Sequence, residues 1–286
     1  MGTILNILVD GIAYGMILFM ISVGLSVTMG LMRVINLAHG GFAMLGGAAV
    51  HWLGSIAGLP FAVAAPLAVA AVVALAVPME RVLFRPIYRM DELQQVLATI
   101  GIAFLMIASV NLWLGSALLP IRLPAAWTGS VDLGFRSLPM HRLVVIVAGI
   151  AVAGGLYLLI DRTRFGIRLR AAVDNRAAAS ALGIDTGRVY ALTFGLGAGL
   201  AAAGGILGAE LLPIDAYYPL RYMVLFLIVV AVGGMGSIAG SFLAALALGI
   251  LQQAALYLLP DFGTIVFFVS VIALLALRPQ GLLGRV

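Results

Sequence analysis

Cysteine and lysine are both missing from this 286-residue sequence. Without cysteine there is no disulfide framework, no thiolate nucleophile and no cysteine-based metal site. Without lysine there is no Walker A loop, in which a lysine reaches the nucleotide phosphates, and no Schiff-base chemistry. No pattern indicates a metal or a cofactor, and no nucleophile–base pair stands out. The sequence therefore predicts a protein that is not an enzyme, and any ATP that drives it is hydrolysed by another chain.

Charge is scarce as well. Only 9% of the residues are charged and 64% are hydrophobic. In soluble domains about 25% of the residues are charged and about 45–50% are apolar. Several uncharged runs reach the roughly 20 residues that a helix needs to cross a bilayer. We expect an all-α fold, a polytopic transmembrane bundle of about eight or nine spans, some of them broken or interrupted by glycine. The expected spans are residues 4–32, 36–57, 60–79, 93–116, 142–160, 188–211, 222–239, 241–259 and 262–277. The run 222–259 is the least certain part, because it fits either two full helices or one broken, re-entrant segment.

All 16 basic residues are arginine, and the net charge is +5. The arginines fall in the loops between spans, so they indicate orientation in a lipid bilayer and not binding to nucleic acid. Placing the loops 80–92 and 161–188 inside, with Arg33, Arg278 and Arg285, puts the N-terminus outside and the C-terminus inside. The arginines left for the outer side are Arg122, Arg136, Arg142 and Arg221. The whole chain, 1–286, is expected to form one transmembrane permease domain.

The stretch MRVINLAHGGFAMLGG, residues 32–47, interrupts an apolar region with polar side chains and paired glycines. Broken backbone at membrane depth is tolerated only against protein or a water-filled cavity. The candidate substrate-pathway residues here are Asn36, His39, Gly40 and Gly41. The alternative is that the polar groups cap a helix end and the glycines permit close helix packing. A metal site is not expected, because no second histidine or acid stands at ligand spacing.

A second glycine-dense stretch, VGGMGSIAGS, covers residues 232–241 inside the longest uncharged run. Glycine-interrupted segments in the two halves of a transporter point to a pathway near the bilayer midplane. This reading adds Gly233, Gly234 and Gly236 to the candidate pathway residues and allows for an inverted repeat. Packing of helices through small residues is the competing interpretation.

The basic loop, residues 161–188, is too long to be a simple turn. Asp174 can cap a helix, residues 177–182 favour one, and Gly183 can end it. Asp185 or Thr186 can then cap the next span. We expect a short helix across the cytoplasmic face that a partner protein contacts. The alternative is a basic loop that only orients the chain in the membrane.

Four stretches in order resemble the smaller of the two permease types in branched-chain amino-acid ABC importers. They are residues 24–47 (GLSVTMGLMRVINLAHGGFAMLGG), 174–207 (DNRAAASALGIDTGRVYALTFGLGAGLAAAGGIL), 232–251 (VGGMGSIAGSFLAALALGIL) and 278–284 (RPQGLLG). The resemblance implies a multi-pass protein of the bacterial plasma (inner) membrane that works by alternating access. It also implies a second homologous permease, two cytoplasmic ATP-binding subunits and an extracytoplasmic substrate-binding protein. The residues that resemble the ATPase-coupling motif are Arg176, Ala178, Ala179, Leu182, Gly183 and Ile184.

The cargo implied by this resemblance is a branched-chain or related amino acid, and relatives of the family also carry urea and short amides. Two other functions compete with it. A stand-alone ion-coupled secondary transporter would need a buried acid or histidine to carry the coupling ion, and His39 is the candidate. A channel would need a repeated ring of carbonyls or charges, and no such pattern is present.

Overall fold

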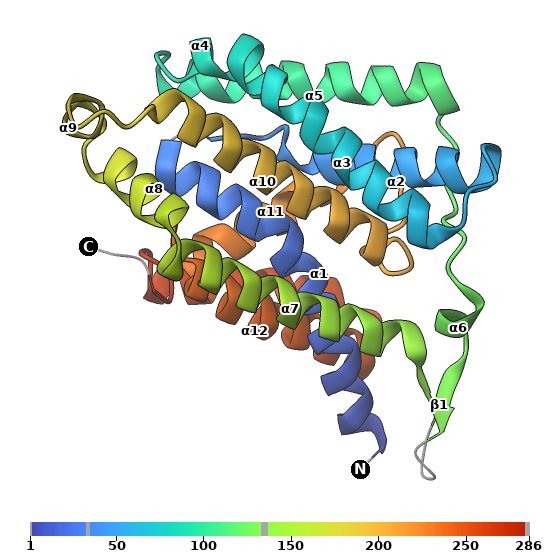
Figure 1. The fold of residues 1–286 in the computed structure, drawn as a ribbon. Coiled ribbons are helices and arrows are strands. Elements are labelled where there is room, and N and C mark those ends of the chain that lie inside the picture. The colour runs from blue at the N-terminus through green and yellow to red at the C-terminus, as the bar shows by residue number, and fades with distance from the viewer. Residues whose placement is uncertain (1, 33–34, 133–136, 284–286) are drawn as a thin grey trace.

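The computed structural model describes residues 2–32, 35–132 and 137–283, and it is almost entirely helical (Figure 1). Arg33, Arg136 and Arg285, which the sequence assigned to sides of the membrane, lie outside the described residues. The predicted all-α polytopic fold is confirmed. Strand occurs in the described residues as one small antiparallel pair, β1 (Ser130–Asp132) with β2 (Ser137–Pro139).

Six helical stretches of the described chain are long and apolar enough to cross a membrane, and two apolar helices are shorter. The second long stretch is α3 continued by a π-helical turn, η2 (Glu80–Phe84), and α4 (Arg85–Ile87). The helices of the long stretches are α1 (Gly2–Met32), α3 (Phe61–Met79), α5 (Glu92–Leu114), α7 (Met140–Arg162), α10 (Thr186–Gly208) and α12 (Ile238–Leu258). The shorter apolar pair are α11 (Tyr218–Gly233) and α13 (Gly263–Leu277). The remaining elements are α2 (His39–His51), η1 (Trp52–Ile56), α6 (Ala125–Thr128), α8 (Arg164–Asp174) and α9 (Arg176–Ala181).

The centre of the bundle is α1, which packs along α10 and α12. Glycines set these contacts, because a helix without side chains at the crossing lets its neighbour approach closely. A Cβ on Gly24 would lie 2.5 Å from the carbonyl oxygen of Gly197 in α10, and a Cβ on Gly11 would lie 2.7 Å from the Cα of Ile250 in α12. Farther along, Gly208 of α10 faces Ile17 of α1. Gly24 of α1 thus faces the middle of α10, whereas Ile17, which is earlier in α1, faces the last residue of α10. The two helices are therefore antiparallel.

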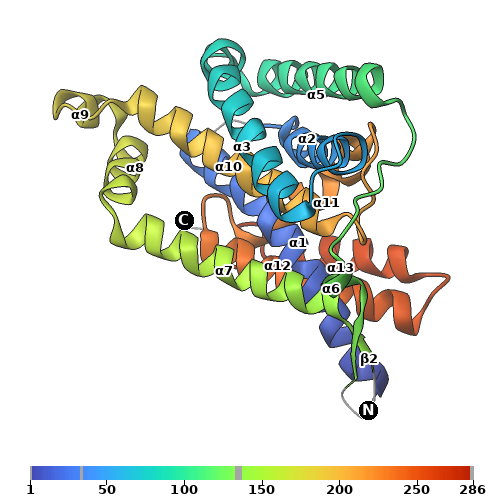
Figure 2. The ribbon, with the colours of Figure 1, turned by 45° about the vertical axis from the view of Figure 1, so that its right-hand side comes forward.

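The molecule has two distinct ends (Figures 1 and 2). At one end lie α4, α8 and α9, and we call this the α9 end. At the opposite end lie the start of α1 and the β1–β2 pair, and we call this the hairpin end. The segment between α5 and α7 runs along the hairpin end and contains α6 and the two strands.

The ambiguous run 222–259 forms two helices, α11 and α12, joined by the turn 234–237. Gly234 and Gly236 have φ angles of 92° and 80°, which favour glycine and end α11 before the chain reverses. Two separate helices, and not one re-entrant segment, are therefore present. The first begins at Tyr218, four residues before the predicted start, because Pro219 fits the first turn of a helix.

Candidate functional site

The basic loop forms two helices at the α9 end, α8 and α9, between α7 and α10. Thr163 caps α8 by accepting a hydrogen bond from the backbone N–H of Gly166. The side chain of Asn175 caps α9 by accepting from the N–H of Ala178 at 2.9 Å. The sequence favoured Asp174 for this role. Asn175 takes it because α8 continues through Asp174 and the chain becomes extended only at Asn175.

Gly183 ends α9, as its sequence position predicted. Its φ angle of 82° is in the left-handed region, where glycine has no Cβ penalty. The N–H of Gly183 donates to Ser180 O and the N–H of Ile184 donates to Ala179 O, at 3.0 Å each. These two bonds form a Schellman motif, which satisfies the last carbonyls of the helix. Asp185 then caps α10 through the N–H of Arg188 at 3.0 Å, so one of the two predicted caps is confirmed.

The position of α9 is fixed by contacts with the base of α10. The guanidinium of Arg176 lies 5.2 Å from the ring centroid of Tyr190, and the Tyr190 hydroxyl donates to Ala172 O in α8 at 3.0 Å. Ala179 is buried against this base, whereas Leu182 is 82% exposed. The helix is thus held against α10 on the side of Ala179, and Leu182 extends away from it.

A buried carboxylate ties a second segment to the start of α10. Glu80 is completely buried, and Nη2 of Arg85 lies 3.2 Å from its Oε2. The same Nη2 donates to Gly187 O, also at 3.2 Å. Burial, together with the neighbouring Glu80, raises the pKa of the Tyr88 phenol well above its ordinary value, so Tyr88 stays neutral. The sequence placed Glu80 in an inner loop and gave no sign of this link, because Gly187 is distant along the chain.

Asn36 and His39 lie inside the bundle where α2 begins, and both side chains are almost fully buried. Asn36 Oδ1 accepts from the N–H of Ala38 at 3.0 Å, which forms an Asx turn just before the helix. His39 Nε2 lies 3.0 Å from Ile21 O, so α2 starts beside the middle of α1 and not at its end. Asn36 precedes the helix and His39 begins it, so the two polar residues lie close together at the start of α2.

The start of α11 has the same local structure as the start of α2. Asp215 Oδ1 accepts from the N–H of Tyr217 at 3.0 Å, and α11 begins at Tyr218. The two starts are neighbours, because a Cβ on Gly40 would lie 3.3 Å from the Cα of Pro219. The chain therefore has two discontinuous helices whose beginnings meet in the core, and the sequence did not reveal that Asp215 is the counterpart of Asn36.

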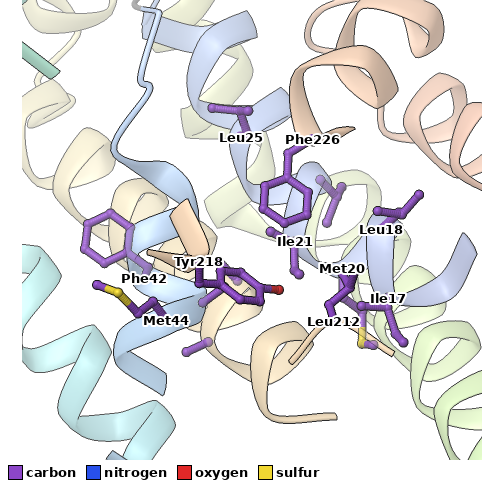
Figure 3. Close-up of a cluster of buried hydrophobic side chains, with 14 of the residues drawn as sticks. Ile17, Leu18, Met20, Ile21, Leu25, Phe42, Met44, Leu212, Tyr218 and Phe226 are labelled. Carbon is purple, nitrogen blue, oxygen red and sulfur yellow. The ribbon is translucent and has the colours of Figure 1, made fainter. Parts of the chain in front are cut away.

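Large side chains fill the space around these two helix starts (Figure 3). Tyr218 and Phe226 of α11 lie between Ile21 and Leu25 of α1 on one side and Phe42 of α2 on the other. Gly41 of α2 faces the Met106 side chain of α5, with 2.6 Å between a hypothetical Cβ and the Met106 sulfur. In this conformation the predicted pathway residues of α2 are enclosed by the chain's own helices.

Gly233 ends α11, and Gly234 and Gly236 lie in the turn before α12. None of the three is brought together with Asn36 and His39. A Cβ on Gly236 would lie 3.1 Å from the Cα of Gly30, near the end of α1. The tail packs on the same turn, where Leu282 N donates to Val232 O at 2.6 Å and Leu283 N to Gly233 O at 3.3 Å. The glycines here permit three backbone segments to approach one another closely.

Among the described residues, no group of three or more histidine, cysteine, aspartate or glutamate residues is placed to hold a metal ion. The features of the site are thus a rigid, partly exposed helix at one end and two broken helices in the core.

Comparison with known families decides what kind of protein carries these features. The model of a family described as "Branched-chain amino acid transport system / permease component" matches residues 7–275. The chain belongs to this family. It is a multi-pass membrane permease, so the predictions of a transport permease and of a chain that is not an enzyme are confirmed.

Three relatives show how far the similarity of this permease extends. LivH of Escherichia coli (strain K12), a high-affinity branched-chain amino acid transport system permease protein, is 30% identical, with 96% of this chain and 94% of LivH covered. BraD of Pseudomonas aeruginosa, with the same description, is 29% identical over 97% of this chain and 95% of its own length. A probable branched-chain amino acid transport permease of Methanocaldococcus jannaschii is 25% identical, with coverage of 97% and 92%.

A solved structure has the same fold. PsaBC from Streptococcus pneumoniae, in complex with Fab, matches with a TM-score of 0.51 and covers 97% of this chain and 91% of that chain. The two sequences are 12% identical, so the likeness concerns the fold alone.

Proposed function

We propose that this permease is one half of the translocation pathway of an ATP-driven ABC importer for branched-chain or related amino acids. The support for this cargo is that LivH and BraD, which match it over nearly their full length, are named as branched-chain amino acid permeases. Urea or a short amide is the alternative cargo. The whole chain acts as one permease domain and moves its substrate by alternating access.

The partners that we propose are a second homologous permease, two cytoplasmic ATP-binding subunits and an extracytoplasmic substrate-binding protein. The missing lysine supports separate ATP-binding subunits, because this chain cannot form a Walker A loop. The bundle crosses the membrane nine times. Six passes are the long helices, and the other three are α2, α11 and α13. The α9 end is cytoplasmic, which agrees with the arginines of α8.

The observation that carries this proposal is the geometry of α9. Both caps and the Arg176–Tyr190 contact hold this helix in place. The residues that form or end it are Arg176, Ala178, Ala179, Leu182, Gly183 and Ile184. We infer that the exposed Leu182 enters a groove of the ATPase. Because Asp185 follows directly and caps α10, a displacement of α9 passes to α10 and from there to α1 and α2.

The substrate pathway that we propose runs beside the two discontinuous helices, past Asn36, His39, Gly40 and Gly41. Both helices start inside the core, and interruptions of helical backbone at this depth are tolerated where a cavity opens. Gly233, Gly234 and Gly236 stay predicted pathway residues at the cytoplasmic end of α11. Alternating access would expose these enclosed residues when α2 and α11 separate.

A reconstitution experiment tests the proposal. With the partner subunits in proteoliposomes, leucine uptake is expected to require ATP and the binding protein. Leu182→Glu is expected to reduce recovery of the ATPase with the permease and to reduce uptake with it. Leu259→Glu, a matched change in an exposed turn at the hairpin end, should leave ATPase recovery unchanged. Uptake that an ion gradient drives without any ATPase would instead establish a secondary transporter.

A further inference from the structure

A cavity opens at the hairpin end, away from α9. Its volume is about 280 Å³. It lies between the loop 118–123, the start of α7, the end of α10 and the loop before α11. Aliphatic side chains make most of its wall, namely those of Leu118, Leu119, Ile121, Leu123, Ile206 and Ile214.

One acid and one histidine interrupt this apolar wall. His141 is 2% exposed, and its Nδ1 lies 2.9 Å from Oε2 of Glu210. Glu210 is 44% exposed, so its carboxylate lies beside a buried histidine and is open to a ligand. The cavity therefore combines a fixed negative group with an aliphatic lining, which matches a ligand that has an ammonium group on an aliphatic body.

The cavity is also connected to the core. Leu119 N donates to Ile214 O at 2.8 Å, which joins the two loops that form it. Ile214 packs on Gly47 of α2, where a Cβ would lie 2.6 Å from the Ile214 side chain. His51 Nδ1, at the end of α2, lies 2.7 Å from Pro120 O. The walls of the cavity thus rest on α2, whose other end carries Asn36 and His39.

We propose that this cavity is an outer binding site at which the permease itself takes up an aliphatic amino acid before translocation. Glu210 binds the α-ammonium group, and the aliphatic wall holds the side chain. Arg122, an exposed residue between the lining residues Ile121 and Leu123, is the partner that we propose for the α-carboxylate. This inference rests on the proposed function, because it names a site that the imported substrate occupies.

The chemistry of the site implies selectivity. Glutamate would bring a second carboxylate toward Glu210, and like charges at short range repel. Lysine would have to desolvate a second ammonium group against aliphatic carbon, which is costly. Leucine, isoleucine and valine meet neither penalty.

The cysteine-free sequence permits a direct test in the assembled transporter. Ala209→Cys places one thiol in this chain at the cavity wall, and Leu123→Cys places one at the opposite side. Labelling by a membrane-impermeant thiol reagent is measured without ATP and without the binding protein, and the permease is separated from its partners by mass. Leucine is expected to slow labelling several-fold, whereas glutamate and lysine at the same concentration should not.

A charge-removing variant and a matched control complete the test. Glu210→Gln should raise the leucine concentration that gives half-protection by roughly 10- to 100-fold, because a hydrogen bond to a charged group is lost. Asp261→Asn removes an acid from the exposed turn after α12 and should leave protection unchanged. If leucine does not slow the labelling of either cysteine variant in a transporter that imports leucine, the proposed site is wrong and the proposed function stands. Protection by leucine in a transporter that never imports it supports the site and overturns the proposed function.

Discussion

Gly24 of α1 and Gly197 of α10 face each other at the centre of the bundle, backbone against backbone. A Cβ on Gly24 would lie 2.5 Å from Gly197 O, and a Cβ on Gly197 would lie 3.0 Å from Gly24 O. The crossing is reciprocal, so neither helix can accept a side chain there without moving.

The first prediction concerns this crossing. Gly24→Ala is expected to lower the free energy of unfolding by about 1–3 kcal/mol, the usual effect of overpacking a tight contact. Gly154→Ala in α7 is the matched control, because nothing lies within 4 Å of a Cβ at that position. Thermal unfolding in detergent, followed by tryptophan fluorescence, should show a lower midpoint for Gly24→Ala alone. Equal midpoints for the two variants would contradict the prediction.

The buried ion pair gives the second prediction. Arg85→Ala leaves the carboxylate of Glu80, which is completely buried, without its charged partner. Breaking a buried pair from one side typically costs about 3–5 kcal/mol, and the exposure of Arg85 should bring the loss toward the lower end. Arg89→Ala, which removes an exposed arginine of the same loop, should have little effect.

A double-mutant cycle separates this pairing from the loss of the arginine itself. Glu80→Gln combined with Arg85→Ala should be more stable than Arg85→Ala alone, because no unpaired charge remains in the core. Additive losses of stability in the double variant would show that the pair is not coupled. The readout is the same thermal unfolding experiment.

The third prediction concerns the start of α2. Asn36→Ala removes the acceptor for the N–H of Ala38, and losing a hydrogen bond of this kind costs about 0.5–1.5 kcal/mol. The predicted result is a lower unfolding midpoint together with slower leucine uptake. Asn111→Ala, which removes a long 3.5 Å bond between exposed side chains, should change neither. Normal stability with strongly reduced uptake would assign Asn36 to substrate contact and not to helix capping.

The helices were largely predictable because their signal is local. Uncharged apolar runs gave nearly correct bounds, for example 241–259 against the observed Ile238–Leu258. Gly183 and Asp185 were also predictable, since left-handed glycine and a capping carboxylate each act on residues a few positions away.

Pairings between distant segments were not predictable from the sequence. Asp215 matches Asn36 only because the chain returns into the core after α1 and again after α10, so that Gly40 lies beside Pro219. The turn of Gly234 and Gly236 looked like a break within the membrane, yet it joins two helices at the α9 end. A glycine-rich sequence indicates that backbones can approach closely. It does not indicate at which depth in the membrane they do so.

The last prediction concerns the end of α9. Gly183→Val forces a β-branched residue to a φ angle of 82°, a conformation that costs about 1–2 kcal/mol and is avoided by such side chains. Nothing lies within 4 Å of a Cβ at this position, so backbone strain and not a clash is the expected effect. The Schellman motif should open, Leu182 should lose its fixed position, and fewer leucine molecules should be imported for each ATP hydrolysed. Gly183→Asn is the matched control, because asparagine tolerates the left-handed region, and it should keep most of the coupling. Measuring uptake and ATP hydrolysis in the same proteoliposomes gives the ratio directly, and an unchanged ratio in Gly183→Val would exclude a role for the geometry of α9 in coupling.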